Sequence, residues 1–392
     1  MQRKIKVLNI FSTIDDGGLE ILVYRIYKSL DKEMYDLNIC SLTIPPDKFI
    51  TQGFKKICSN WLFLNFKNKN VGIFDFIRNI LLTFKLARYI AKNKFDIIHS
   101  HDFFPAFITR ISVIISRLFF YKPKRLFITY HNICYWLKPL HHFINRVLSR
   151  ITDNNVCVTN SVKNYAIIKE KIKEDKFVVI YNGLNSAEFF PDNNLRDSQR
   201  KILGYAENDF VLCNVGVYSV RKGQIYLLKA FKNLLTKHKN LKLALVGSIR
   251  NHEIDIYEEM VNFVKKYNLD NYVKFVDTTK EVNKIYNMLD LFVMCSVTEG
   301  FGLAAYEAML AEKLCIFSDI APFKELIEDG VNGFIFENKN VESLTKVLEY
   351  VISNYDELEN IRKYGREFVK TKLSEEEMVS KYNSLYNISN LS

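Results

Sequence analysis

Short apolar runs rich in β-branched and aromatic residues alternate with longer stretches of helical periodicity along the whole chain. In the first half we expect strands at residues 6–11, 37–42, 97–100, 126–130, 156–159 and 178–181, with helices at 19–30, 74–92 and 162–170. Parallel strands need crossover connections, and helices are the usual crossovers. The alternation therefore predicts an α/β fold in which a parallel sheet carries helices on both faces.

A polar stretch at residues 190–199 divides this pattern into two series. We interpret it as a linker, because it lacks apolar periodicity and begins Phe190-Pro191-Asp192. Strands of the second series are expected at residues 210–217, 241–246, 273–276, 291–295, 314–317 and 333–336. A chain of 392 residues also exceeds the size at which one core keeps growing. The sequence predicts two doubly wound, Rossmann-like domains, residues 1–188 and 189–370, facing across a cleft. A C-terminal helix within residues 371–392 fits either domain and could pack back on the first.

The net positive charge of the chain is confined to its first half. Residues 1–190 hold 29 Lys and Arg against 15 Asp and Glu, whereas the remainder holds 26 against 29. The basic half contains apolar-rich stretches at residues 73–94, 103–125 and 136–150. Zinc-finger spacing, a ribonucleoprotein-type aromatic motif and an Arg-rich arm are all missing, so we expect no nucleic-acid partner. An anionic membrane surface or a phosphorylated lipid acceptor fits better, and ordinary amphipathic helices are the alternative.

The cysteines and the apolar runs bear on the compartment. The seven cysteines are scattered and include no Cys-x-x-Cys, which favours buried free thiols in a reducing compartment. The first apolar run is broken by Lys6 and Asn9 and is followed by acidic residues, so it predicts a strand rather than a signal peptide. Arg or Lys interrupts every candidate membrane span. We expect a cytoplasmic protein that could be peripheral at the inner face of the cell membrane.

Residues 299–307, Glu-Gly-Phe-Gly-Leu-Ala-Ala-Tyr-Glu, carry the strongest functional signal. They follow an expected strand and lead into a helix expected over 303–310, so free N–H groups and a positive helix end would face an anion such as a phosphate. Glu299 and Glu307 are separated by about 12 Å if the path between them is helical, at 1.5 Å per residue. Two acids so placed could bind both ends of a nucleotide sugar. The alternative is that this segment is only a surface acid followed by a turn and the start of a helix, which would give the same sequence pattern.

Two further glycine turns lie at expected strand ends. Asp15-Asp16-Gly17-Gly18 follows the first strand, and Tyr218-Ser219-Val220-Arg221-Lys222-Gly223 follows the first strand of the second series. Glycine allows close backbone approach, and a lysine at such a turn can reach a diphosphate as a point charge.

Together with these turns, several short motifs match one family. They are Asp96-Ile97-Ile98-His99-Ser100-His101, Thr129-Tyr130-His131, Val179-Ile180-Tyr181-Asn182-Gly183, Val215-Gly216, Leu245-Val246-Gly247, Asn332-Gly333-Phe334 and the pair Tyr382 and Tyr386. With Glu299 and Glu307, the combination resembles the retaining nucleotide-sugar glycosyltransferases of the two-Rossmann (GT-B) class, family 4 (group 1). The resemblance covers nearly the whole chain. It implies an acceptor-side first domain and a second domain that binds the nucleotide sugar.

The resemblance also implies roles for residues of the second domain. Glu307 resembles the acid that accepts hydrogen bonds from the ribose, and Glu299 resembles the acid beside the hydroxyls of the transferred sugar. Lys222 is similar to the phosphate-binding lysine of the family. The donor-binding residues implied around them are Gly216, Gly247, Gly300, Phe301, Gly302 and Leu303, the last three through their backbone amides.

In the first domain the resemblance implies that the loop at Gly17 and Gly18 approaches the donor phosphate. His131 resembles the histidine that follows the fifth strand and lines the sugar site, so the implied catalytic group is Glu299, Lys222 and His131. His101 is an acceptor-side candidate. Each histidine has the alternative role of a hydrogen-bonded structural residue.

Two departures from the family pattern stand out. Val217 occupies a position where the family carries Arg, so one cation for the leaving diphosphate is missing. Arg221 lies nearby, but because it directly precedes Lys222 we expect its side chain to point elsewhere. The second departure is Gly247-Ser248-Ile249, which lacks a further glycine found in the family.

We expect an enzyme that uses no cofactor and no metal ion. The chain contains no Asp-x-Asp, and its seven histidines show no metal-ligand spacing. The resemblance implies a UDP- or GDP-linked sugar donor, retention of anomeric configuration, and a lipid-linked or cell-surface glycan acceptor in capsule or lipopolysaccharide biosynthesis. A nucleotide-sugar epimerase and a non-catalytic nucleotide-sugar-binding protein are the alternatives.

Overall fold

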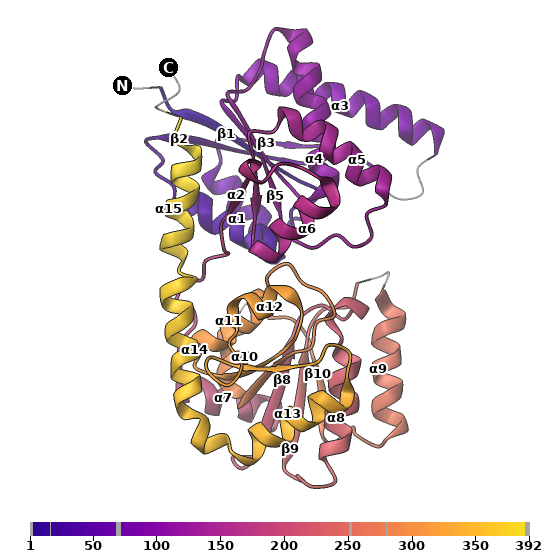
Figure 1. Cartoon of the computed structure of the whole chain (residues 1–392), viewed down its shortest axis with the longest axis vertical. Helices are drawn as coiled ribbons and strands as arrows, with labels where there is room; N and C mark the ends of the chain where they lie inside the picture. The colour runs from indigo at the N-terminus through magenta and orange to yellow at the C-terminus, as the bar shows by residue number, and fades with distance from the viewer. Residues whose placement is uncertain (1–2, 16, 68–71, 251–252, 280, 389–392) are drawn as a thin grey trace. The chain divides into compact units, whose positions relative to one another are not determined.

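The computed structural model describes residues 3–15, 17–67, 72–250, 253–279 and 281–388. The chain forms two compact units (Figure 1). One unit contains the residues up to Gly183 and those from Glu376 onward, and the other contains Leu184–Glu375. The division thus falls a few residues before the expected boundary, and the last helix belongs to the first unit.

The first unit is built on a parallel sheet of seven strands in the order β3-β2-β1-β4-β5-β6-β7. The strands are β1 (Ile5–Phe11), β2 (Tyr35–Ser41), β3 (Asn60–Phe63), β4 (Ile97–His101), β5 (Arg125–Tyr130), β6 (Asn154–Cys157) and β7 (Phe177–Val179). All but β3 were predicted. β3 is a four-residue edge strand with two exposed side chains, so it leaves almost no apolar signal in the sequence.

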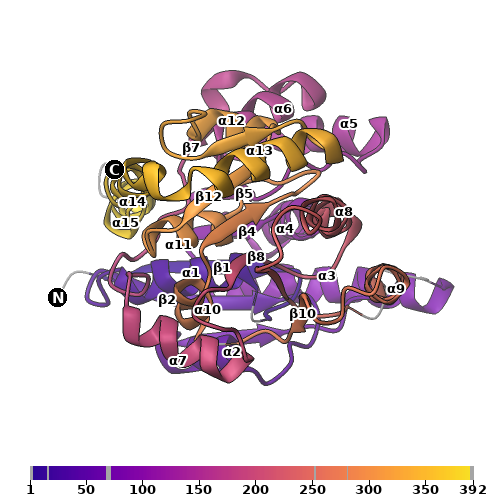
Figure 2. The ribbon, with the colours of Figure 1, turned by 90° about the horizontal axis from the view of Figure 1, so that it is seen from below.

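Alternate residues of these strands pack on opposite faces of the sheet. Val7 contacts the layer formed by α1 (Gly18–Ser29), α2 (Phe49–Ile57) and α15 (Glu375–Tyr386), whereas Leu8 contacts the layer formed by α3 (Ile73–Asn93) and α4 (Phe103–Ser116). The remaining elements are η1 (Arg117–Phe119), α5 (Pro139–Leu148), η2 (Ser149–Ile151), α6 (Asn160–Glu170) and η3 (Glu174–Lys176). Figure 2 shows the first unit from another side.

The second unit is built on a parallel sheet of six strands in the order β10-β9-β8-β11-β12-β13. The strands are β8 (Phe210–Val215), β9 (Leu241–Val246), β10 (Val273–Val276), β11 (Leu291–Met294), β12 (Leu314–Ser318) and β13 (Phe334–Phe336). Besides α7, the helices described in this unit are η4 (Val220–Lys222), α8 (Gln224–Leu234), α9 (Ile254–Lys266), α10 (Val282–Met288), α11 (Leu303–Leu310), α12 (Ala321–Leu326), α13 (Val341–Ser353), η6 (Tyr355–Leu358) and α14 (Glu359–Lys372). The structure confirms the predicted pair of doubly wound parallel sheets.

The predicted linker at residues 190–199 is wrong, because helix α7 (Asn193–Leu203) occupies most of it. The Asp192 carboxylate caps this helix by accepting from the backbone N–H groups of residues 194 and 195. Buried Arg200 anchors it, with its guanidinium 2.5 Å from the carboxylate of Asp290, which also pairs with Arg196 at 2.9 Å. The buried side chain of this helix is Arg200 and its apolar residues are few, so its sequence gives little apolar signal.

Candidate active site

The strand order of the second unit reverses between β8 and β11, which lie side by side near the centre of its sheet. In doubly wound sheets the crevice beyond the carboxyl ends of such strands is the usual ligand site. η4, which contains Lys222, follows β8, and Glu299 follows β11. The topology therefore brings two predicted site residues from distant parts of the chain to one sheet edge.

Lys222 and Glu299 form the centre of this site. The Lys222 Nζ lies 2.6 Å from Glu299 Oε1, and the Ser296 hydroxyl donates to the same oxygen at 3.1 Å. Glu299 is only 6% exposed. Burial alone would raise the pKa of Glu299, but the charges of Lys222 and Arg221 and the hydrogen bonds hold this pKa below its usual value. The carboxylate is therefore ionised at neutral pH.

The structure corrects the expectation that Arg221 points elsewhere. Its NH1 atom lies 3.0 Å from Glu299 Oε2, so Arg221 and Lys222 pair with the two oxygens of one carboxylate. The turn of η4 lets two adjacent residues converge in this way, because the Ser219 hydroxyl caps it by accepting from the Lys222 backbone N–H. Arg221 thus places a second cation at the site, where Val217 cannot supply one.

Backbone contacts hold η4 against the end of β11. The Val297 N–H donates to the Arg221 carbonyl at 2.8 Å, and the Cys295 thiol contacts the Lys222 carbonyl at 3.4 Å. Gly223 has a φ of +66°, and a Cβ there would collide with the Cys295 carbonyl oxygen. Only glycine fits this close approach, which sets the position of Lys222.

The two predicted glycines at the ends of β8 and β9 also have a packing role. A Cβ on Gly247 would meet the carbonyl oxygen of Gly216, and a Cβ on Gly216 would lie 3.2 Å from the Lys222 Cε. The neighbouring loops are tied by the Tyr218 N–H, which donates to the Ser248 carbonyl. The glycines therefore leave room for the lysine stem and for close loop contact.

Helix α11 begins at the predicted glycine turn. Its N-cap, Gly302, has a φ of +91°, and the ring of Phe323 occupies the space that a Cβ would need. The Phe301 side chain is buried against Tyr306, with ring centroids 4.9 Å apart, so Phe301 offers a ligand only its backbone. Gly300 precedes this turn, and Leu303 is the first residue of the helix. The amino end of α11 can thus present backbone N–H groups to an anion.

Glu307 lies on α11 and is half-buried. The hydroxyl of Tyr286 donates to its Oε2 at 2.7 Å. Burial first, and then the charge of Glu307, raises the pKa of Tyr286, which keeps the phenol protonated as a donor. The sequence analysis missed Tyr286, because a single tyrosine in a helix gives no signal of a partner that lies in another helix.

In the first unit the two predicted histidines contact each other. His101 Nδ1 and His131 Nε2 are 3.0 Å apart, and His101 Nε2 lies 2.6 Å from the Asn9 side-chain oxygen. Burial lowers the pKa of both histidines, and in His101 the neighbouring His99 adds to the effect. The rings are therefore neutral at physiological pH.

The glycine turn of the first unit lies at the start of α1. Gly17 is the N-cap of this helix, and its carbonyl accepts from the Ile21 N–H at 3.0 Å. Gly18 is the first helical residue. Asp16, part of the same motif, lies outside the described residues. Helix α1 thus begins at the predicted glycine turn, with the Glu20 carboxylate close to Gly17, and the role implied for this turn stays a prediction.

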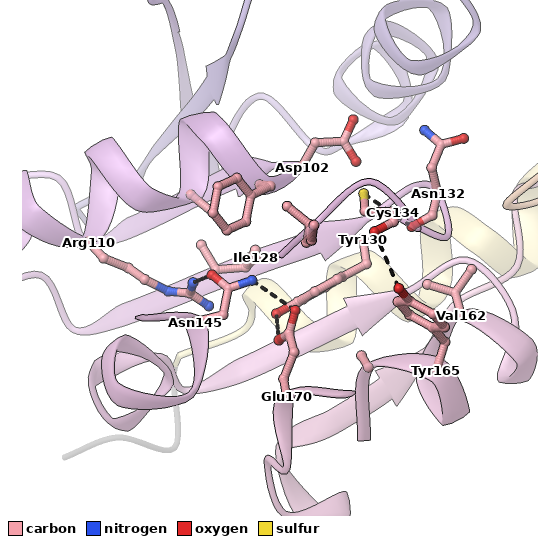
Figure 3. A pocket seen from close by; sticks show the side chains of 14 residues that line it. Asp102, Arg110, Ile128, Tyr130, Asn132, Cys134, Asn145, Val162, Tyr165 and Glu170 are labelled. Atoms are coloured by element: carbon pink, nitrogen blue, oxygen red, sulfur yellow. Dashed lines mark hydrogen bonds between the residues drawn. The ribbon is translucent and has the colours of Figure 1, made fainter. Parts of the chain in front are cut away.

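A small pocket that was not predicted lies beside the ends of β4 and β5, against α4, α5 and α6. Figure 3 shows Asn145 between Arg110 and Glu170 in this pocket. Arg110 donates to the Asn145 oxygen at 2.9 Å, and the Asn145 amide and the Tyr130 hydroxyl donate to Glu170. Burial raises the pKa of Glu170, and these partners oppose the rise. Because these groups satisfy one another, the network holds α4, β5, α5 and α6 together.

Three observations bear on metal, redox chemistry and membranes. Within the described ranges, no three His, Cys, Asp or Glu side chains gather in a group that could hold a metal ion. The seven cysteines are free thiols, six of them buried. Among the helices that the structure describes, none is long and apolar enough to span a bilayer.

The two doubly wound parallel sheets are the architecture of the two-Rossmann, GT-B fold. A crystal structure of HepE from Anabaena, in complex with UDP and glucose, has the same fold, with a TM-score of 0.84 and 20% identity. The match covers 97% of this chain and 99% of that one.

Family models cover both units. Residues 16–188 match the model of glycosyltransferase family 4, and residues 196–368 match that of the glycosyl transferases group 1. The chain therefore belongs to the group 1, family 4 glycosyltransferases, which confirms the resemblance that the sequence indicates.

Similar proteins with named functions align with most of the chain. An Escherichia coli UDP-Gal:alpha-D-GlcNAc-diphosphoundecaprenol alpha-1,3-galactosyltransferase is 23% identical over 352 residues, 88% of this chain and 87% of that protein. The Staphylococcus aureus capsular polysaccharide biosynthesis glycosyltransferase CapM is 24% identical over 328 residues, 81% of this chain and 83% of that protein.

Proposed function

We propose that this glycosyltransferase moves a sugar from a nucleotide diphosphate donor, with UDP as the expected nucleotide, to a lipid-linked glycan during the assembly of a cell-surface polysaccharide. The observation that carries the proposal is the convergence of Lys222 and Arg221 on Glu299 at the switch point of the second sheet. Two cations and one acid leave a positive site beside the amino end of a helix. This combination suits a sugar diphosphate.

The names of two relatives support the acceptor class and the pathway. The Escherichia coli relative is named for a UDP-linked donor and a diphosphoundecaprenol-linked acceptor, and the Staphylococcus aureus relative for capsule biosynthesis. By analogy, we propose a polyprenyl-linked acceptor and a product destined for a capsule or lipopolysaccharide. The enzyme would act in the cytoplasm, peripheral at the inner face of the cell membrane.

Lys222 and Arg221 can bind the diphosphate while they stay paired with Glu299. An ammonium has three N–H donors and a guanidinium five, so Lys222 and Arg221 retain donors beyond those that face Glu299. The Glu299 carboxylate likewise keeps lone pairs for a sugar hydroxyl. We propose that Glu307, oriented by Tyr286, accepts from the ribose, while the amides of α11 face the phosphates.

We propose a retaining reaction that needs no metal ion. The bond between the anomeric carbon and the diphosphate oxygen breaks, and the electron pair leaves with the diphosphate. The acceptor hydroxyl then attacks on the same face and gives its proton to that leaving oxygen. Fixed cations and N–H donors aimed at the developing charge are the groups that lower such a barrier. His131 of the first unit would serve the sugar, and buried His101, whose ring nitrogens face Asn9 and His131, would act by holding His131 in place.

The test is a transfer assay with the full chain. Undecaprenyl-diphosphate-linked saccharides are incubated with UDP- and GDP-linked sugars, and nucleotide release is followed with and without EDTA. We expect acceptor-dependent release of UDP, unaffected by EDTA, and NMR coupling constants that show the donor's anomeric configuration in the product. Interconversion of donor sugars without transfer would identify an epimerase, and binding without any product a binding protein. Activity lost on chelation and restored by Mn²⁺ would contradict the metal-free step.

A further inference from the structure

Helix α3 exposes apolar side chains over its first half, which is unusual for a folded unit. Phe74 is 85% exposed, and the other members of this face are Ile73, Phe76, Ile77, Ile80, Leu81 and Phe84. The buried residues of α3 begin only at Thr83 and continue through Leu86, Ala87 and Ile90. The second half of the helix therefore anchors it to the core, while the first half presents an apolar surface that has no partner among the described residues. Contiguous apolar surface of this kind marks an interaction site.

Two further regions of the first unit also expose apolar side chains. η1 contacts α3 and exposes Leu118 and Phe119, and the residue that follows it, Phe120, is 99% exposed. α5 contacts α4, and the exposed apolar side chains in and just before α5 are Trp136, Leu140, Phe143 and Val147. Figure 2 shows α4 between α3 and α5 in the first unit. We call the exposed apolar residues of α3, η1 and the α5 region the apolar face.

Basic side chains accompany the apolar face. Exposed Lys85, Arg88 and Lys92 follow the apolar half of α3, Arg117 lies in η1, and Arg146 lies in α5. Acidic residues are scarce in these elements: α3 contains only Asp75, and η1 and α5 contain none. Apolar groups bordered by cations are complementary to a bilayer interface with anionic headgroups.

We propose that the apolar face docks on an anionic lipid bilayer, with its apolar side chains in the interfacial layer and the adjacent cations at lipid phosphates. This inference deepens the proposed function, because a membrane-embedded polyprenyl acceptor can be reached only by an enzyme at the bilayer. A second copy of the chain fits the face less well, because two such surfaces would bring like charges together.

Vesicle binding by the full chain tests the proposal. Wild-type protein should co-sediment with vesicles of phosphatidylglycerol and phosphatidylcholine, less so at high salt. Phe74→Ser with Leu81→Ser should lower the partition coefficient at least tenfold, since each loses about the transfer free energy of one large apolar side chain. Ile202→Ser on α7 is the matched control, because Ile202 is 72% exposed but lies in the second unit.

The outcomes separate docking from catalysis. The double variant should keep the wild-type rate on a water-soluble acceptor analogue, whereas failure of the proposed function would abolish this rate in the wild type as well. Absence of vesicle binding by wild-type protein at 0.1 M salt would overturn the docking proposal. So would a concentration-dependent dimer, seen by sedimentation, that the double variant abolishes without any vesicle binding, since the face would then be a self-association surface.

A separate observation concerns the hydrogen-bond chain that ends at His131. The Tyr27 hydroxyl donates to the Asn38 carbonyl at 3.0 Å, so its oxygen must accept from the Asn9 side-chain nitrogen, 2.6 Å away. Asn9 therefore turns its oxygen toward His101 Nε2, which must carry a proton. In a neutral ring His101 Nδ1 is then an acceptor, and its partner, His131 Nε2, must be the donor.

We infer that Asn9 is a positioning residue that acts through His101 to fix His131 as the Nε2–H tautomer. His131 Nδ1 is then an acceptor, suited to a hydroxyl of a sugar ligand, whereas the other tautomer would present an N–H there. The inference on the tautomer stands on the hydrogen-bond chain alone. The benefit to the reaction rests on the proposed function.

Nitrogen NMR of the wild-type protein tests the tautomer directly. Two-bond ¹H–¹⁵N correlations should show His131 protonated at Nε2, and the Nδ1–H tautomer would overturn the inference. Asn9→Leu removes the acceptor, so we expect a tautomer mixture at His131 and a kcat about tenfold lower on transfer. Tyr27→Phe removes the closer acceptor of the Asn9 amide and leaves only the Tyr386 hydroxyl, at 3.5 Å, to orient it. An unchanged His131 tautomer in folded Asn9→Leu would refute the positioning role.

Discussion

Replacement of Lys222 by glutamine is the sharpest perturbation of the proposed site. Lys222→Gln removes one positive charge while keeping a polar side chain of similar width beside Gly216. Glu299 stays paired with Arg221 at 3.0 Å, so the carboxylate is not left alone in its buried position. We expect the unfolding free energy to fall by about 1–3 kcal/mol, the cost of one lost partner of a buried polar group. The variant should therefore fold.

The effect on turnover should be much larger than that on stability. Loss of one fixed donor aimed at a developing charge lowers kcat by about 10²–10³, equivalent to about 3–4 kcal/mol of barrier. Arg221→Gln should lower kcat only about tenfold, because the Arg221 side chain is 39% exposed and water screens its charge. If the two cations act together on the diphosphate, the double variant should deviate from the product of the single effects.

The assay is acceptor-dependent UDP release, with kcat and KM measured separately and donor affinity obtained by calorimetry. Lys229→Gln is the matched control, because it makes the same charge change on the exposed side of α8. Turnover of folded Lys222→Gln within threefold of wild type would refute the assignment of Lys222 to the leaving group. A loss confined to KM would indicate that Lys222 binds donor and transition state equally.

The same variant makes a prediction about pH. The folded-state pKa of Glu299 is depressed, so its contribution to stability is present above its unfolded pKa and is lost as the pH falls through the folded pKa. Removal of Lys222 takes away the largest favourable charge on Glu299 and must raise the folded pKa. Acid unfolding of Lys222→Gln should begin at a higher pH than that of Lys229→Gln. Superimposable acid-unfolding curves would contradict the ion pair.

Other parts of the structure give further predictions. Arg200→Met should lower the unfolding free energy in urea by about 3 kcal/mol, because it removes the closest partner of buried Asp290, and a change below 1 kcal/mol would argue against this ion pair. Glu307→Gln should raise the KM for the donor at least tenfold with little change in kcat, and Tyr286→Phe should raise this KM by a smaller factor. If Glu307→Gln lowered kcat alone, Glu307 would have another role in the reaction. Gly223→Ala should lower the unfolding free energy by about 1–3 kcal/mol and also lower turnover, because the added Cβ displaces the turn that holds Arg221 and Lys222. A thermal unfolding curve identical to that of the wild type would rule out this packing constraint.

The sequence predicts best those strands and helices whose own residues show a clear apolar pattern bounded by turn residues. β11 and α11 lie close to the expected ranges, because a run such as Leu291–Met294 is apolar on both faces and a glycine turn separates it from the helix. α7 and β3 escaped prediction for the opposite reason. From the sequence alone, Arg200 is expected to be a polar surface residue although it is buried, and the two exposed residues of β3 are expected to belong to a loop.

By itself the sequence determined the alternation of strands and helices, the two doubly wound sheets and the pairing of motifs that marks the family. These features follow from local periodicity and from turn residues, which act over a few neighbouring positions. The tertiary structure alone decided that Arg221 turns toward Glu299, that Tyr286 orients Glu307, and that Asn9 sets the hydrogen bonds of His101 and His131. Along the chain, Arg221 is 78 residues from Glu299, Tyr286 is 21 residues from Glu307, and Asn9 is 92 residues from His101. Only the folded structure brings these polar atoms within hydrogen-bonding distance.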